Sequence, residues 1–157
     1  MIEYISRNAD DTKALGMEIG LIARPGLIIT LNGDLGVGKT VLARGVGRGL
    51  GIDQPITSPT FTILHQYRGR LALYHFDMYR LIDEDEIFEL GFEEFIYGDG
   101  VSVIEWPENM GELHPDEYVE IIIERIDDNM RKIKINSIGD EFNWLEEMLL
   151  EYVSTCD

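Results

Sequence analysis

The sequence predicts an α/β fold: a mostly parallel sheet with flanking helices and added antiparallel hairpins. Two apolar runs, residues 27–31 and 101–104, lack the alternation of half-buried strands, which indicates strands that helices cover on both faces. Two other pairs of β-type segments are each joined by a short polar turn, as in hairpins. Helical patterns stand between them, and we expect residues 1–157 to form a single domain.

The first part of the chain predicts two strands and two helices. In chain order they are a strand over residues 2–5, a helix over 8–22, the buried strand 27–31 and a helix over 39–50. Asn8 suits the start of the first helix, because its side chain can accept a hydrogen bond from the first turn. The second helix contains Gly45, Gly47 and Gly49. A glycine inside a helix costs up to about 1 kcal/mol relative to alanine, so we expect close packing on the sheet as compensation.

The second part of the chain predicts two hairpins, a buried strand and two more helices. They are a hairpin of 62–67 with 71–79, a helix over 83–90, the strand 101–104, a hairpin of 118–126 with 130–138, and a helix over 142–153. Gly91 is expected to end the first of these helices in a left-handed conformation. The last helix is amphipathic and carries no motif, so we expect it to serve packing.

A glycine-rich segment follows the first buried strand directly and opens the second helix. It reads Gly33, Asp34, Leu35, Gly36, Val37, Gly38, Lys39 and Thr40. This is the complete G-x-x-x-x-G-K-[ST] pattern in the strand–loop–helix context that it requires. Glycines let successive backbone N–H groups point at phosphate oxygens, and the helix N-terminus adds a partial positive charge. We therefore predict a P-loop NTPase-like domain in which Lys39 reaches the β- and γ-phosphates and Thr40 offers its hydroxyl to Mg²⁺.

Acidic side chains in two other strands are candidates for the rest of the site. Glu105 follows the buried run 101–104, and a carboxylate at the carboxyl end of a parallel strand points into the same crevice as the loop. We expect Glu105 to be the second Mg²⁺ ligand beside Thr40. Asp77 is expected in mid-strand, a costly place for a carboxylate without a partner or a task. It could orient the attacking water, contact Mg²⁺ through a water, pair with Arg80 or face solvent.

Two further features have both a functional and a structural interpretation. Residues 57–61 combine two threonines and a serine around a proline, and this segment could sense the γ-phosphate as switch loops do or be a plain turn. Trp106, next to Glu105, could stack near the nucleotide or pack in the core, and its neighbour favours the site.

Charge and composition bound the class of protein. The net charge is −17 with only 13 scattered Lys and Arg, so we expect no tight direct binding of nucleic acid by this chain alone, because phosphate neutralisation supplies most of that affinity. An acidic surface could dock on a basic protein or serve solubility alone. We expect no membrane span and no signal peptide. The one cysteine, Cys156, fits a reducing compartment, and we expect a cytoplasmic protein.

Five segments together resemble a known family in their order and spacing. They are residues 33–40, 57–61, 75–81, 89–91 and 105–108. The string around Asp77, which reads His-Phe-Asp-Met-Tyr-Arg-Leu, and the Glu105–Trp106 pair are more specific than the loop. The sequence resembles the TsaE family, also called YjeE, small bacterial ATPases of tRNA threonylcarbamoyladenosine synthesis. The resemblance covers nearly the whole chain, residues 3–138.

The resemblance implies a protein that binds and hydrolyses ATP with Mg²⁺. It implies TsaB and TsaD as partners, which attach a threonylcarbamoyl group to an adenosine of tRNAs that read codons beginning with A, with TsaD performing the transfer. It assigns Thr40 and Glu105 to Mg²⁺, Asp77 to hydrolysis and Arg131 to a position near the nucleotide, and it places the nucleotide loop at residues 35–40. We expect slow hydrolysis by the isolated chain, because no arginine finger in cis is evident.

Two other functions use the same loop. A small-molecule kinase, the main alternative, needs an acceptor pocket and usually an Arg-bearing lid, and the chain has no Arg-rich lid segment. A guanine-specific switch usually carries an [NT]-K-x-D string, and none is found, since Thr12-Lys13 is followed by Ala14-Leu15. An ATPase that drives a protein complex is the interpretation that the residues favour.

Overall fold

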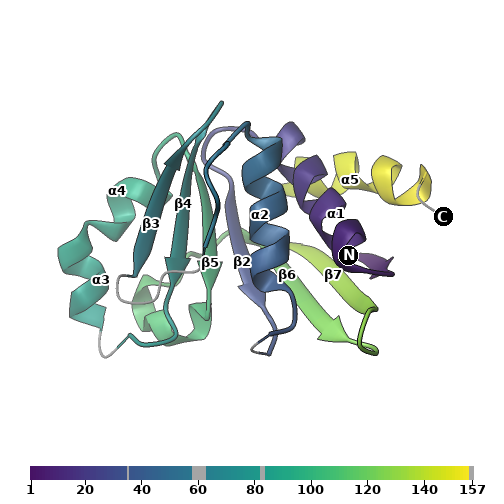
Figure 1. Cartoon of the computed structure of the whole chain (residues 1–157). Coiled ribbons are helices and arrows are strands. Elements are labelled where there is room, and N and C mark those ends of the chain that lie inside the picture. The colour runs from purple at the N-terminus through teal and green to yellow at the C-terminus, as the bar shows by residue number, and fades with distance from the viewer. Residues whose placement is uncertain (35, 58–62, 82–83, 156–157) are drawn as a thin grey trace.

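The strands form one mixed sheet in the part of the chain that the computed structural model describes, residues 1–34, 36–57, 63–81 and 84–155. They are β1 (Ile2–Ser6), β2 (Ile28–Asn32), β3 (Leu64–Arg68), β4 (Ala72–Asp77), β5 (Val101–Glu105), β6 (Tyr118–Arg125) and β7 (Arg131–Ile138). Their order is β1-β7-β6-β2-β5-β4-β3 (Figure 1). The central strands β6, β2, β5 and β4 run parallel, whereas β3 and β7 join them antiparallel and β1 pairs antiparallel with β7. The predicted parallel sheet with added hairpins is confirmed.

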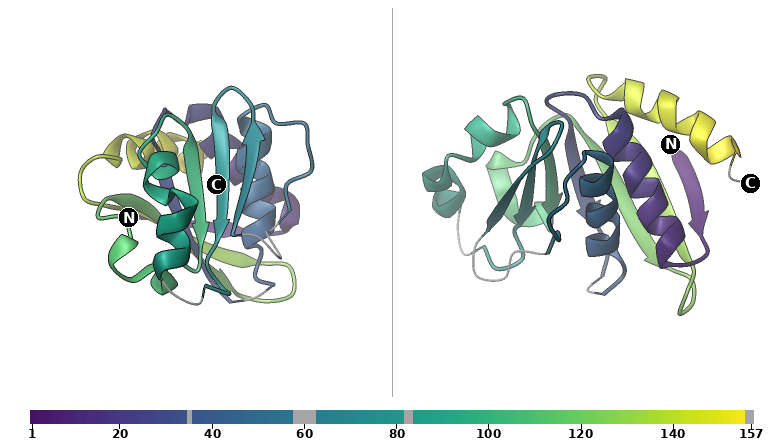
Figure 2. Two further views of the ribbon diagram at one scale, coloured as in Figure 1. Left: turned by 90° about the vertical axis from the view of Figure 1, so that its left-hand side faces the viewer. Right: turned by 45° about the horizontal axis from the view of Figure 1, so that its top comes forward.

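Helices flank this sheet. They are α1 (Ala9–Ile22), α2 (Lys39–Gly49), α3 (Glu84–Leu90), α4 (Phe92–Ile96), α5 (Asn143–Thr155) and the 3-10 helix η1 (Pro107–Leu113). Helices α1 and α2 lie side by side along the sheet, while α3 and α4 lie at its β3–β4 end and α5 at its β1–β7 end (Figures 1 and 2). Within the described residues, no helix combines the length and apolar character that crossing a membrane requires.

The core lies where the two predicted apolar strands run. All of β5 is buried, and so is β2 up to its last residue, which is half-buried. Because helices or other chain segments cover both faces of these strands, neither needs a polar face. Because β2 and β5 are parallel, the residues that follow their carboxyl ends lie at the same edge of the sheet.

Helix α1 begins as its sequence predicts. The side chain of Asn8 accepts a hydrogen bond from the backbone N–H of Asp11 at 2.8 Å. This bond satisfies one of the donors that the first turn of a helix leaves without an intrahelical partner. The N-terminal end of α1 is thereby fixed beside the loop that follows β2.

Helices α1 and α2 pack through glycines. A Cβ atom built at Gly45 would run into the carbonyl oxygen of Lys13, and one at Gly49 would run into that of Met17. On the facing helix, a Cβ at Gly16 would meet Leu42 in the same way. The expectation that these α2 glycines pack on the sheet is therefore wrong for Gly45 and Gly49, because the close neighbour is α1.

Two predictions about local structure also need correction. The strand expected over 71–79 ends at Asp77, because the Asp77 carboxylate accepts the backbone N–H of Tyr79 at 2.9 Å and closes a turn. Asp77 is thus at the strand end and not in mid-strand. Helix α4 and the helix η1 were not predicted, since α4 has only 5 residues and η1 is a 3-10 helix interrupted by the non-helical Gly111.

Candidate nucleotide-binding site

The candidate site lies at the carboxyl ends of three neighbouring parallel strands. The glycine-rich loop leaves β2, Glu105 ends β5 and Asp77 ends β4. In open α/β sheets this edge is where ligands bind, because the loops that leave the strands diverge there. The tertiary fold thus brings together segments from three distant parts of the sequence.

The loop backbone has the conformation that its glycines permit. Gly33, Gly36 and Gly38 have φ angles of 149°, 76° and 117°, a region that residues with a side chain rarely adopt. Cβ atoms built at Gly36 and Gly38 would meet nothing within 4 Å, so the backbone there is open to an incoming group. Leu35 lies outside the described residues.

Helix α2 points its N-terminus into this opening. Its N-cap is Gly38, which has no side chain to accept the N–H groups of the first turn. Those N–H groups and the helix dipole together favour a negatively charged group at this position. The backbone of the loop and the start of α2 thus suit an anion, and Lys39 adds a positive charge beside them.

Lys39 is buried, and two contacts hold its ammonium group. Its Nζ donates a hydrogen bond to the carbonyl oxygen of Gly33 at 2.8 Å. The same Nζ lies 4.0 Å from the centre of the Trp106 ring, a cation–π contact. The side chain thus folds back across the loop that it belongs to.

A cavity of about 310 Å³ gathers most of the predicted residues. Its lining consists of Gly36, Gly38, Lys39, Thr40, Val41, Asp77, Tyr79, Glu105 and Trp106. Both predicted metal ligands, Thr40 and Glu105, border the same space as Asp77. Trp106 also lines it, as its place next to Glu105 suggested, and Tyr79 was not predicted.

Glu105 is a buried carboxylate with a defined partner. Its side chain belongs to a strand in which every residue is buried, and only 4% of the residue is exposed. Its Oε2 lies 2.6 Å from Nε2 of His75, a side chain with no exposed surface. Sequence reasoning missed this contact, although His75 precedes Asp77 by two residues and so faces the same side of β4.

Asp77 is directly paired with Glu105 in the register of β4 and β5. Partial burial raises the pKa of the Asp77 carboxyl above its ordinary value of 3.8, the Tyr79 N–H bond opposes that rise, and the negative charge of Glu105 adds to it. A carboxylate with a raised pKa is a better proton acceptor at neutral pH.

Trp106 closes one side of the cavity in an unusual backbone conformation. Its φ of 57° makes it the only non-glycine residue with a positive φ in the described part of the chain. Its ring centre lies 4.9 Å from that of Tyr79, so the Trp106 ring contacts both Tyr79 and the Lys39 ammonium. Such strained residues persist where the surrounding structure holds them, often at binding sites.

Arg131 supports the loop from the other side. Its Nε donates to the carbonyl oxygen of Val37 at 2.7 Å, and its NH1 donates to those of Asp127 and Met130 at 2.7 and 2.9 Å. It borders a second cavity of about 200 Å³ that shares the loop residues Gly36 and Gly38, and Val41 of α2, with the first. The lining is Asn8, Ala9, Thr12, Gly36, Val37, Gly38, Val41, Asp128, Asn129 and Arg131. The structure thus places Arg131 beside the loop, with its guanidinium bonded to backbone carbonyls.

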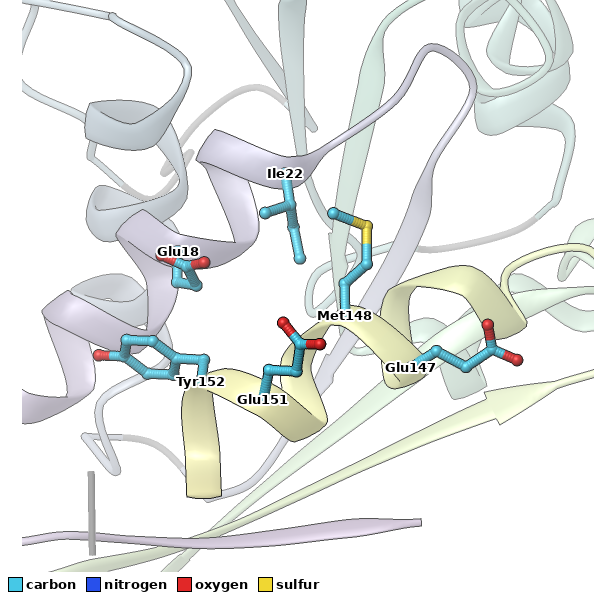
Figure 3. A pocket seen from close by; sticks show the side chains of 6 residues that line it. All are labelled: Glu18, Ile22, Glu147, Met148, Glu151 and Tyr152. Atoms are coloured by element: carbon cyan, nitrogen blue, oxygen red, sulfur yellow. The ribbon is translucent and has the colours of Figure 1, made fainter. Parts of the chain in front are cut away.

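A third cavity, of about 550 Å³, lies between α1 and α5 and differs in chemistry (Figure 3). Its lining consists of Glu18, Ile22, Glu147, Met148, Glu151 and Tyr152, with Ile22 and Met148 facing each other across the gap. The three carboxylates of this lining, Glu18, Glu147 and Glu151, would repel a phosphate. This cavity is therefore no candidate for the phosphate site.

The donor set at the first cavity fits Mg²⁺. A hydroxyl and a carboxylate are hard oxygen ligands, and Mg²⁺ is commonly held by one or two such protein groups with phosphate oxygens and water completing the octahedron. Within the described residues no group of three His, Cys, Asp or Glu side chains could hold a metal ion by itself.

The segment 57–61, which the sequence offered as a switch loop or a plain turn, is described only at Thr57. Residues 58–61 lie outside the described residues. Thr57 donates its N–H to the Tyr67 hydroxyl at 3.3 Å.

Comparisons with known proteins show the family of this chain. The family described as threonylcarbamoyl adenosine biosynthesis protein TsaE matches residues 6–133. The chain is 42% identical over 157 residues to the tRNA threonylcarbamoyladenosine biosynthesis protein TsaE of Bacillus subtilis (strain 168), across 99% of this chain and 96% of that protein. It is 43% identical over 131 residues to the protein of the same name in Treponema pallidum (strain Nichols), across 83% and 97%.

A solved structure shows the same fold. The crystal structure of Bacillus subtilis YdiB matches with a TM-score of 0.81 and 36% identity, over 96% of this chain and 95% of that one. The range matched by the family, residues 6–133, spans the glycine-rich loop and the strands that end in Asp77 and Glu105. The chain therefore belongs to the TsaE family of threonylcarbamoyl adenosine biosynthesis proteins.

Proposed function

We propose that this protein binds and hydrolyses ATP with Mg²⁺ as a cytoplasmic accessory protein of tRNA N6-threonylcarbamoyladenosine biosynthesis. The observation that carries the proposal is one cavity of about 310 Å³ bordered by the open loop backbone, Lys39, Thr40 and Glu105. Family membership and the names of the Bacillus and Treponema relatives support the pathway. The predicted adenine nucleotide and metal remain a proposal.

The loop and α2 are the groups that would bind the phosphates. Gly36 and Gly38 border the cavity, and the start of α2, which has no side-chain cap, would offer its N–H groups and its dipole. Lys39 would exchange its bond to the Gly33 carbonyl for a phosphate oxygen, a stronger charge-assisted bond. Mg²⁺, when bound, neutralises phosphate charge, and Thr40 and Glu105 are the residues that would hold it.

Asp77 is the group that would act on the attacking water. It lies at the end of β4 and lines the same cavity as Lys39. Its raised pKa suits a carboxylate that positions a water molecule and accepts its proton. Trp106 and Tyr79 cover this side and would exclude other water from the phosphates.

We further propose that the partners are TsaB and TsaD, and that hydrolysis is slow until they bind. The net charge of −17 suits docking on a basic protein surface and opposes tight direct binding to tRNA. Arg131 is bonded to three backbone carbonyls, so it is not placed to serve as an arginine finger.

The test begins with binding and then adds the partners. Calorimetry of the full chain with ATP or ADP and Mg²⁺ is expected to show binding that Lys39→Ala weakens about 10- to 100-fold, the loss expected for a charged hydrogen bond. Hydrolysis is then measured alone and with TsaB and TsaD, and tRNA modification is measured in a strain that carries the same variant. Lys134→Ala is the control, because Lys134 pairs with Glu124 away from the cavity.

Two results would contradict the proposal. One is wild-type protein that binds no adenine nucleotide. The other is normal tRNA modification in the Lys39→Ala strain. Turnover that rises with a sugar or nucleoside acceptor, and not with TsaB and TsaD, would instead support a small-molecule kinase.

A further inference from the structure

His75 is a polar side chain in the core of the sheet, behind the proposed nucleotide site. It lies in β4, has no exposed surface and faces the same side as Asp77. The described residues that line the cavity do not include His75. Burial of an imidazole is unfavourable unless its polar atoms have partners, so the contact that it makes needs an explanation.

The imidazole makes one hydrogen bond. Its Nε2 lies 2.6 Å from Oε2 of Glu105, whereas its Nδ1 is buried and has no hydrogen-bond partner among the described residues. A carboxylate only accepts hydrogen bonds, so Nε2 carries the hydrogen. The tautomer with its hydrogen on Nε2 places the donor where the acceptor is and leaves Nδ1 without a hydrogen to satisfy.

This bond restrains a group whose orientation matters. Glu105 has a flexible side chain with two rotatable bonds before its carboxyl group, and it stands at the tip of β5. With Oε2 held from the sheet side, the carboxylate has a defined plane at the border of the cavity that Thr40 shares. Mg²⁺ requires nearly ideal octahedral geometry, and hydrogen bonds to a ligating carboxylate set its direction.

We propose that His75 is the positioning residue of Glu105: its Nε2–H holds Oε2 and so presents the carboxylate to the metal ion of the nucleotide complex. This inference rests on the proposed function, because it needs a metal–nucleotide complex in the cavity. His75 itself contacts neither metal nor nucleotide in this arrangement. The competing view is that the His75–Glu105 pair only stabilises the sheet by satisfying two buried groups.

Metal affinity distinguishes these views. We would titrate Mn²⁺ into the full chain with bound ADP and follow free Mn²⁺ by electron paramagnetic resonance, with thermal unfolding as a check of folding. His75→Leu removes the donor and is expected to weaken Mn²⁺ binding about 10- to 100-fold, the usual loss for an outer-shell partner. His75→Gln keeps an N–H donor near Nε2 and is expected to restore affinity close to that of the wild type. ADP binding in EDTA is expected to be equal in all three proteins.

A double variant tests whether His75 acts through Glu105. In a Glu105→Gln background, which lacks the carboxylate ligand, His75→Leu is expected to cause no further loss of Mn²⁺ affinity. If His75→Leu does not fold, His75→Met also removes the donor, with a side chain that adapts to irregular core space.

The outcomes are distinct. Mn²⁺ affinity that is unchanged in His75→Leu, or equally reduced in His75→Leu and His75→Gln, overturns the positioning role. If His75→Leu lowers Mn²⁺ affinity as much in the Glu105→Gln background as in the wild type, that result also overturns it. If the wild-type protein itself shows no metal-dependent ADP binding, the proposed function fails, and the inference fails with it.

Discussion

Asp77 and Glu105 lie opposite each other in the parallel register of β4 and β5, so two carboxylates stand at one edge of the sheet. Their surroundings differ. Glu105 is buried and receives a hydrogen bond from His75, whereas Asp77 is half-buried and accepts the Tyr79 amide. Two acids in different environments can have different tasks, which suits the proposal that Glu105 holds the metal ion and Asp77 acts as the base.

Replacement of Asp77 is expected to affect hydrolysis and to spare binding. Asp77→Asn keeps the shape of the side chain and its acceptor for the Tyr79 N–H but cannot take a proton. We expect ATP turnover in the presence of TsaB and TsaD to fall about 100- to 10,000-fold, the range of general base catalysis, with nucleotide affinity nearly unchanged. Steady-state kinetics and calorimetry measure the two quantities. Asp85→Asn, on the exposed face of α3, is the control, and an equal loss in both variants would contradict a role for Asp77.

The same substitution predicts a pH-dependent change in stability. The folded-state pKa of Asp77 is raised above 3.8, so its contribution to stability is present below that value and is lost as pH rises through the folded pKa. Asparagine cannot ionise, so the Asp77→Asn variant does not lose this stability as the pH rises. We therefore expect the metal-free variant, in EDTA, to unfold at a higher temperature than the wild type near neutral pH, with the difference disappearing in acid. A variant that is less stable at neutral pH would contradict this sign.

Trp106 is expected to report nucleotide binding by fluorescence. Its ring lies 4.0 Å from the Lys39 ammonium, and that contact changes if the lysine moves to a phosphate. The chain has two tryptophans, so Trp144→Phe leaves Trp106 as the single emitter. We expect its emission to change when Mg-ATP is added, because the cation that quenches or shifts the indole leaves the ring. In the Trp106→Phe protein, the emission of the remaining Trp144 is expected not to change when Mg-ATP is added. A change in that emission would show that nucleotide binding alters the surroundings of Trp144 as well.

The glycine contact between α1 and α2 makes a prediction whose sign is diagnostic. Helix propensity alone predicts that Gly45→Ala stabilises the protein by about 1 kcal/mol. The close approach of the Lys13 carbonyl predicts destabilisation by about 1–3 kcal/mol, because an inserted methyl group forces the helices apart. Denaturant unfolding measures this difference. The pair Arg48→Ala and Arg48→Gly, at an exposed position of the same helix, gives the propensity effect alone.

Local patterns predicted most of the fold, because they encode local physics. The buried strands 27–31 and 101–104 were recognised by their lack of alternation, and α1 by the capping residue Asn8, since these signals lie within a few residues of each other. The strand expected over 71–79 was too long, because a side-chain bond of Asp77 ends it. Helix α4 was missed because it is too short to show a period, and η1 because it is a 3-10 helix interrupted at Gly111.

The contacts at the site also divide into those that the sequence predicts and those that only the structure shows. The sequence by itself determined the glycine-rich turn that leads into α2, since the turn and the start of the helix are built from adjacent residues. Only the tertiary structure decided that His75 bonds Glu105, 30 residues away, that Lys39 lies over Trp106, and that α1 and α2 meet through glycines. Such contacts depend on strand register and helix packing, which join distant segments and therefore leave no fixed spacing in the chain.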